Sequence, residues 1–229
     1  MPRSATRILL RDELIGFARS KVMLLLWVIL PVTTLAGFLL LRDHAFGGAG
    51  ARMGATAFMS LLESSFAGAV AALMIGVDIV SERNRNVYTL LVIRPLRRET
   101  IILAKFLAVF SCVAIACVVS LLLGTAVDIA RGTPPTAANL HDTGKALVSM
   151  IAVIAMSTAA GALFGVLARS ILVAVILVLY VGQNAAVIPM LPVALGVLPH
   201  RFWWFMVISF ALVALLLWLA CRAFRRAQL

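Results

Sequence analysis

Long apolar runs alternate with short polar segments along the whole 229-residue chain. A helix that crosses the hydrocarbon layer of a bilayer needs about 20 apolar residues. The runs predict six transmembrane helices: Val22–Leu41, Ala55–Val80, Thr100–Val127, Ala146–Ala168, Ile171–Ile188 and Phe202–Ala220. No polar segment approaches the minimum of about 50 residues for a soluble domain. We therefore expect a single all-α transmembrane domain over residues 1–229.

The segment before the first run, residues 6–21, carries apolar residues at helical spacing. Leu10, Leu14 and Phe17 fall on one stripe of a helix, whereas Glu13 is expected to lie elsewhere. This pattern predicts an interfacial helix that rests in the headgroup layer of the membrane. A plain cytoplasmic tail is the alternative.

Two further segments carry packing or helix-breaking signals. The fourth predicted span contains Ser157, Gly161 and Gly165, small residues that let helices approach closely in lipid. Between the fifth and sixth spans, residues 187–200 contain prolines that interrupt a helix: Pro189, Pro192 and Pro199. We expect an external or re-entrant segment there, and lipid tolerates re-entrant backbone only where protein covers it.

The distribution of charge predicts the orientation of the chain. Hydrophobic residues make up 63% of the sequence and charged residues 13%, which excludes a soluble globular protein. With both termini cytoplasmic, only five of the 20 lysines and arginines lie on the external side: Arg42, Arg52, Arg131, Lys145 and Arg201. This positive-inside bias predicts a multi-pass protein of the cytoplasmic (inner) membrane. It also accounts for the net charge of +11 without a nucleic-acid partner.

The connection between the second and third runs is the most informative segment. Apolar residues at positions 87–93 are flanked by charged residues on both sides, which is typical of a short helix with a binding partner. Pro95 is expected to end this helix, because the residue before a proline disfavours the helical region. We therefore predict a cytoplasmic coupling helix within residues 82–98. An ordinary solvated turn is the alternative.

At these positions the chain resembles the permeases of type-2 ABC exporters. That family has an acidic residue leaving the second span, a Thr-Leu-rich coupling helix, a proline, basic residues, and a lysine that opens the third span. The matching positions here are Glu82, Thr89-Leu90-Leu91, Pro95, Arg97-Arg98 and Lys105. The chain departs from the pattern at Asn86 and Val87, where the family has a glycine, and at Leu90, where many members are acidic.

The resemblance implies that the coupling helix sits in a groove of a separate ATPase subunit and transmits its closure to the spans. The implied coupling residues are Glu82, Tyr88, Thr89, Leu90, Leu91, Ile93, Arg94, Pro95, Arg97 and Arg98. Their apolar members would supply buried contact area, and the arginines would pair with acidic groups at the rim. The resemblance also implies two ATPase subunits and a second permease copy or homologue.

The sequence contains no pattern suited to ATP hydrolysis. Gly144-Lys145 lacks both the upstream glycine and the following hydroxyl residue of a phosphate-binding loop. We therefore expect no catalytic residue and no cofactor bound by this chain, with ATP and Mg²⁺ held by the partner subunit.

Three polar residues inside the predicted spans are candidates for a substrate pathway. Glu63 lies in the outer half of the second span, where a carboxylate facing lipid is costly. We therefore expect it to face the bundle interior, a cavity or the external interface. Gln183 and Asn184 lie near the outer end of the fifth span. Each of the three could instead serve only to join helices.

The three histidines are expected on separate external loops, at His44, His141 and His200. They lack the spacing of metal ligands, so we predict no metal site.

Two other classes of function stay open. A secondary transporter or channel would favour paired broken helices and several ionisable groups inside the membrane, whereas this chain shows one broken segment and Glu63. A non-transporting assembly subunit would make the coupling segment dispensable for any flux.

Overall fold

The computed structural model of the chain describes residues 3–43, 55–85, 98–130, 137–182 and 201–226. Every regular element within these ranges is a helix. The elements are α1 (Arg3–Ala18), α2 (Lys21–Asp43), α4 (Ala55–Asn84), α6 (Arg98–Ala130), α7 (Ala137–Leu167), α8 (Ile171–Leu177), the π-helical turn η1 (Val178–Gly182) and α11 (Arg201–Arg226). The prediction of an all-α protein is confirmed for this part of the chain.

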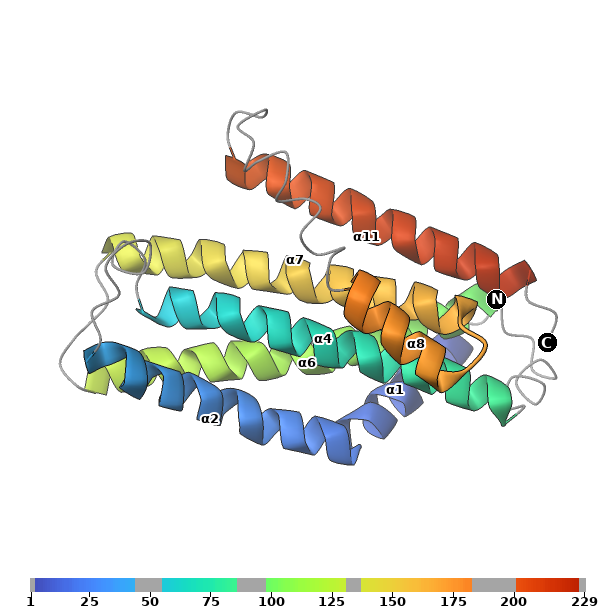
Figure 1. Cartoon of the computed structure of the whole chain (residues 1–229), viewed down its shortest axis with the longest axis horizontal. Helices are drawn as coiled ribbons and strands as arrows, with labels where there is room; N and C mark the ends of the chain where they lie inside the picture. Colours follow the sequence, from blue (N-terminus) through green and yellow to red (C-terminus); the bar gives the residue numbers. More distant parts are fainter. Residues whose placement is uncertain (1–2, 44–54, 86–97, 131–136, 183–200, 227–229) are drawn as a thin grey trace.

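The helices form an elongated bundle in which α4 contacts α2, α6, α7 and α8 (Figure 1). Helix α11 packs mainly on α7 and also contacts α6, while α1 packs on α6. The last turns of α4, α7 and α11 lie at the same end of the bundle as α1 and the start of α6 (Figure 1). We call this the α1 end.

Small residues set the distance between α4 and α7, the pair in most extensive contact. A Cβ atom on Gly161 would lie 2.4 Å from the carbonyl oxygen of Ala72, and one on Gly165 would lie 2.9 Å from the Cα of Gly76. No larger side chain fits at these two positions without moving the backbone of α4. The prediction that small residues of the fourth span allow close helix approach is therefore confirmed.

Four stretches of the described residues are long and apolar enough to cross a membrane: Ser65–Asn84, Glu99–Val127, Thr143–Leu167 and Phe202–Arg226. Helices α1 and α2 meet that criterion only as a pair, with a bend of 62° between them. The described part of the fifth predicted span, Ile171–Gly182, is shorter and ends in a π-helical turn. The chain is thus a multi-pass membrane protein with four such helices among the described residues, or five when the bent pair is counted as one span.

The helices extend further than the apolar runs predicted. Helices α4, α6 and α7 have 30, 33 and 31 residues, and at about 1.5 Å per residue each exceeds a hydrocarbon core of about 30 Å. The third and fourth apolar runs leave residues 128–145 outside the predicted spans, but α6 continues to Ala130 and α7 begins at Ala137. Hydropathy marks only the part of a helix inside the hydrocarbon, whereas backbone hydrogen bonding propagates past it.

Helix α1 turns one side toward the bundle. Phe17 is buried and Leu14 packs against the core, whereas Ile8 and Ile15 are exposed. Two residues of the predicted stripe thus face the bundle, while the placement of the helix in the headgroup layer stays a prediction. The expected single segment over residues 6–21 instead breaks after Ala18, and Ser20 accepts a hydrogen bond from the backbone N–H of Met23 at 3.1 Å, which caps the start of α2.

Candidate functional site

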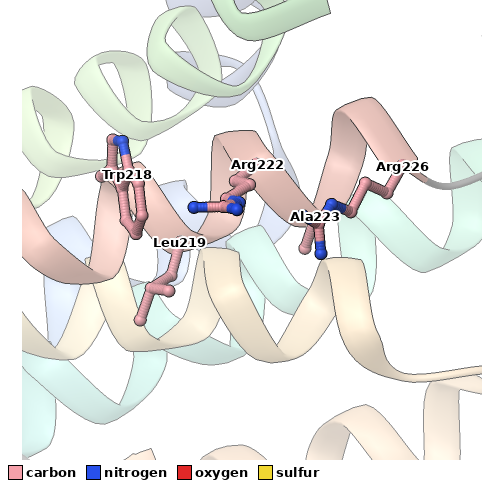
Figure 2. Close-up of a pocket in the computed structure, with 5 residues that line it drawn as sticks. All are labelled: Trp218, Leu219, Arg222, Ala223 and Arg226. Atoms are coloured by element: carbon pink, nitrogen blue, oxygen red, sulfur yellow. The ribbon is translucent and has the colours of Figure 1, made fainter.

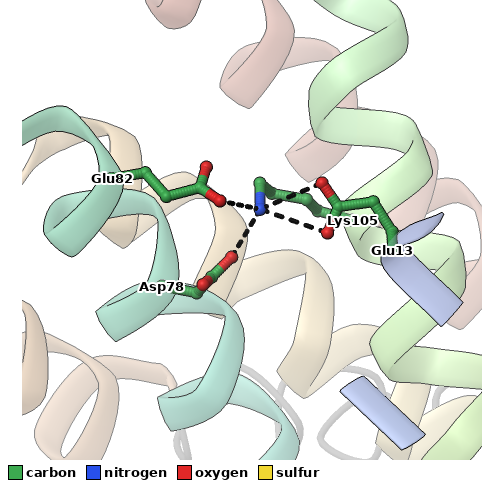
Figure 3. Close-up of polar contacts among 4 residues, drawn as sticks. All are labelled: Glu13, Asp78, Glu82 and Lys105. Atoms are coloured by element: carbon green, nitrogen blue, oxygen red, sulfur yellow. Dashed lines mark hydrogen bonds and ion pairs between the residues drawn. The ribbon is translucent and has the colours of Figure 1, made fainter. Parts of the chain in front are cut away.

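The α1 end contains a cluster of four charged side chains, which we call the Lys105 cluster: Glu13, Asp78, Glu82 and Lys105 (Figure 3). The ammonium nitrogen of Lys105 lies 2.6 Å from Oδ2 of Asp78 and 2.8 Å from Oε1 of Glu82. Its distance to Oε1 of Glu13 is 3.2 Å. One cation thus holds carboxylates from α1 and α4.

Helical spacing explains why these residues meet. Asp78 and Glu82 are one turn apart on α4, so both side chains lie on the same face of that helix. Lys105 lies about two turns after the start of α6, which runs back along α4. Glu13 lies one turn before Phe17 on the inner face of α1, and the ring of Phe17 is 5.8 Å from the Lys105 ammonium.

The cluster is buried and carries excess negative charge. The side chain of Lys105 is 1% exposed, and such a buried cation is tolerated only with paired charges around it. Three carboxylates around one ammonium leave a formal charge of −2. Oε2 of Glu82 is buried and has no hydrogen-bond partner among the described residues.

Two other contacts tie helices together at the same end. Arg83 donates hydrogen bonds to the carbonyl oxygens of Val166, at 3.1 Å, and Ala168. These carbonyls lie at the end of α7, where backbone acceptors have no partner within the helix. On the bundle surface, Arg225 of α11 pairs with Glu99 of α6 at 3.1 Å. The end of α4 is thus joined to α1 and α6 through one set of side chains and to α7 through another.

A second polar cluster lies further along the same helices toward the opposite end, and we call it the Glu63 cluster: Glu63, Thr34 and Ser120. The hydroxyls of Thr34 on α2 and Ser120 on α6 both donate to Oε1 of Glu63 on α4, the latter at 3.2 Å. Glu63 is only 6% exposed. Of the three places expected for this carboxyl, the structure shows the bundle interior.

A family model described as "ABC-2 family transporter protein" matches residues 9–184, which is more than half of the chain. The chain belongs to this family of ABC transporter permeases. Helix α11 lies outside the matched residues. Among curated proteins, none matches the chain.

Only part of the predicted coupling site of this permease lies within the described residues. Glu82 belongs to the Lys105 cluster, and Arg98 is the first residue of α6. These two positions therefore lie at the ends of long helices, on either side of the predicted segment. Tyr88, Thr89, Leu90, Leu91, Ile93, Arg94, Pro95 and Arg97 lie outside the described residues. Their coupling role stays a prediction.

The other predicted positions are divided in the same way. Gln183 and Asn184, together with the proposed re-entrant segment at 187–200, lie outside the described residues. So do His44 and His200. His141 is exposed on the first part of α7, so its expected place on a loop was wrong. Within the described ranges, no group of three or more His, Cys, Asp or Glu side chains is arranged to hold a metal ion.

Two residues of the permease site were missed from the sequence. Glu13 was expected away from the apolar stripe of α1, whereas its side chain is only 18% exposed and faces Lys105. Its position three residues after Leu10 and four before Phe17 places it on that stripe and could have revealed this. Nothing in the sequence pointed to the role of Arg83, because its partners are backbone carbonyls of α7 and every residue has such a carbonyl.

Proposed function

We propose that this ABC-2 permease is the membrane subunit of an ATP-driven exporter and that the segment between α4 and α6 binds a separate ATPase subunit. The observation that carries the proposal is the Lys105 cluster. It joins the last turns of α4 to the start of α6, which are the two sides of that segment, and it joins both to α1.

This arrangement suits the transmission of movement. A displacement of the segment acts first on the ends of α4 and α6. Separating Lys105 from its carboxylates costs about 3–5 kcal/mol for a typical buried pair. A movement of α4 and α6 should therefore carry α1 with it. The close contact of α4 with α7, together with Arg83, extends the same movement to a fourth helix.

Recognition of the ATPase would come from the sequence of the segment itself. Leu90, Leu91 and Ile93 supply apolar contact area, and Arg94 and Arg97 supply positive charge for an acidic rim. In this proposal ATP and Mg²⁺ bind to the partner, and two ATPase subunits serve a pair of permease copies or homologues. The α1 end, with most of the basic residues, faces the cytoplasm, and the chain lies in the inner membrane.

The decisive experiment is a purification of the tagged, detergent-solubilised protein, followed by identification of the co-purifying chains and an ATPase assay. We expect an ABC ATPase in the wild-type complex. Leu90→Asp together with Leu91→Asp should abolish this association while leaving membrane insertion intact, because two charges enter an apolar contact. A matched control is Leu140→Asp, which changes an exposed leucine of α7 far from the segment.

The direction of transport requires a separate measurement. Inside-out vesicles that contain the complex should accumulate exported compounds only when ATP is added outside. A stable complex without an ATPase, or unchanged ATPase binding in the Leu90/Leu91 variant, would contradict the coupling proposal.

A second candidate function, ion-coupled transport without an ATPase, is favoured by the Glu63 cluster. Buried carboxylates inside the membrane commonly mark ion or substrate pathways. For either mechanism we propose that Glu63, Gln183 and Asn184 contribute to the pathway. Glu63→Gln should change substrate-stimulated ATPase activity in the exporter, or abolish gradient-driven flux in an ion-coupled carrier. An unchanged response in both assays would leave Glu63 as a helix contact only.

A further inference from the structure

The outer face of α11 carries a shallow groove close to the α1 end, with a volume of about 400 Å³ (Figure 2). Its lining residues in the described part of the chain come from this one helix: Trp218, Leu219, Arg222, Ala223 and Arg226. Trp218, Arg222 and Arg226 follow one another at intervals of one turn, so they form a single stripe. Buried residues of α11, such as Phe224, lie on the other side of the helix.

The two arginines of this stripe form no ion pair within the described part of the chain. The guanidinium of Arg222 lies over the ring of Trp218, with 5.0 Å to the ring centroid. Arg225, between them in sequence, pairs instead with Glu99 of α6. The groove therefore presents two positive charges one turn apart, next to an aromatic ring and the apolar side chain of Leu219.

The position of the groove along α11 places it at a membrane boundary. The membrane-capable part of the helix is Phe202–Arg226, so Trp218 lies near its last turns and the arginines follow. Tryptophan is enriched where hydrocarbon meets headgroups, and basic side chains there reach the phosphate layer. Anionic lipids attract such residues with about 1 kcal/mol for each lysine or arginine near the surface.

We propose that this groove is a binding site for the headgroup of an anionic phospholipid. The phosphate would lie between Arg222 and Arg226, where guanidinium groups can donate paired hydrogen bonds to its oxygens. The glycerol and the start of an acyl chain would lie along Trp218 and Leu219. The proposal goes beyond the transport function and holds whether or not an ATPase binds.

Fluorescence of Trp218 provides a direct test. The chain has four tryptophans, so replacing Trp27, Trp203 and Trp204 with phenylalanine leaves Trp218 as the single reporter. This protein is reconstituted into phosphatidylcholine vesicles with increasing fractions of phosphatidylglycerol. Bromine atoms, which quench tryptophan at short range, are placed on the acyl chains of one lipid or the other. The two series yield the binding constant of the anionic lipid relative to the zwitterionic one.

We expect the relative binding constant at Trp218 to favour phosphatidylglycerol clearly. In Arg222→Gln with Arg226→Gln it should fall about thirtyfold, as the loss of two such charges predicts. Arg169→Gln, which removes an exposed arginine from the turn between α7 and α8, is the matched control and should leave the ratio unchanged. A protein that keeps only Trp203, at the opposite end of α11, should show a ratio near one.

Two outcomes would overturn the proposal. One is a relative binding constant at Trp218 that does not depend on the two arginines. The other is weak quenching by both lipids in the protein with its arginines intact, which would mean that a second copy or another protein covers the groove. If the glutamine variant fails to fold, the intact protein at raised salt provides the same test, because screening should lower the preference for phosphatidylglycerol.

Discussion

The Lys105 and Glu63 clusters both include residues of α4 and α6, but their carboxyl groups have different partners and different exposure. At the α1 end, charge is balanced in part by a cation, and the carboxylates of Glu13, Asp78 and Glu82 stay 18–30% exposed. Further along the helices, Glu63 is 6% exposed and, among the described residues, is met only by the hydroxyls of Thr34 and Ser120. The first cluster joins helix ends near water. The second contains a buried carboxyl that has no cationic partner among the described residues.

This difference indicates where each cluster contributes most. Removing one member of an ion cluster leaves buried charges without compensation, so its loss acts mainly on stability. Replacing a carboxyl that is held by two hydroxyls lowers the stability of the fold less, because the hydroxyls can bond to other acceptors. The Glu63 cluster is therefore better suited to a functional change that leaves the bundle intact.

The largest effect is expected for Lys105→Met, which leaves three partly buried carboxylates without their cation. We expect the free energy of unfolding to fall by about 3–5 kcal/mol, with a marked loss of folded protein in the membrane. Thermal unfolding of the detergent-solubilised protein checks this. Lys145→Met is the control, because Lys145 is exposed on α7, and it should behave as wild type. Similar stabilities of the two variants would contradict the structural role of the cluster.

An intermediate effect is expected at Glu63. Glu63→Ala removes the acceptor of two hydroxyls and should lower stability by about 1–3 kcal/mol. Glu63→Gln keeps an oxygen acceptor and should cost less, while it still alters transport if the carboxyl charge is used. Comparing the thermal stability and the flux of these two variants separates a packing role from a pathway role. Equal loss of stability in both would show that the carboxylate charge itself supports the fold.

The smallest effect is expected for the surface pair of Arg225 and Glu99, whose side chains are 55% and 39% exposed. Glu99→Gln should change the free energy of unfolding by at most about 1 kcal/mol, because exposed ion pairs are weak and screened by salt. A double-mutant cycle with Arg225→Gln measures the coupling energy directly. A coupling comparable to the loss in Lys105→Met would remove the contrast between the buried and the exposed pairs.

Much of this architecture followed from local patterns. Apolar runs located the four long helices α4, α6, α7 and α11, and the small residues of α7 indicated its close approach to α4. The stripe of Leu14 and Phe17 marked the apolar side of α1, and the structure places that side against the core. Such features depend only on neighbours along one helix and on the contrast between water and hydrocarbon, so a single sequence is enough to reveal them.

Other features depended on which helices meet. The sequence suggested that Glu82 and Lys105 matter, but their ion pair and its extension to Glu13 require α1, α4 and α6 to converge. The helix ends also differed from the apolar runs, since hydropathy does not mark where a helix stops beyond the membrane.

By itself, the sequence determined a multi-pass helical permease with an excess of positive charge at one end. Only the tertiary structure decided that Glu13 and Glu82 share one lysine, that Arg83 binds the end of α7, and that Glu63 is met by hydroxyls from two other helices. The physical reason is that hydrophobicity and helix periodicity act along the chain, whereas ion pairs and hydrogen bonds form between side chains that only packing brings together.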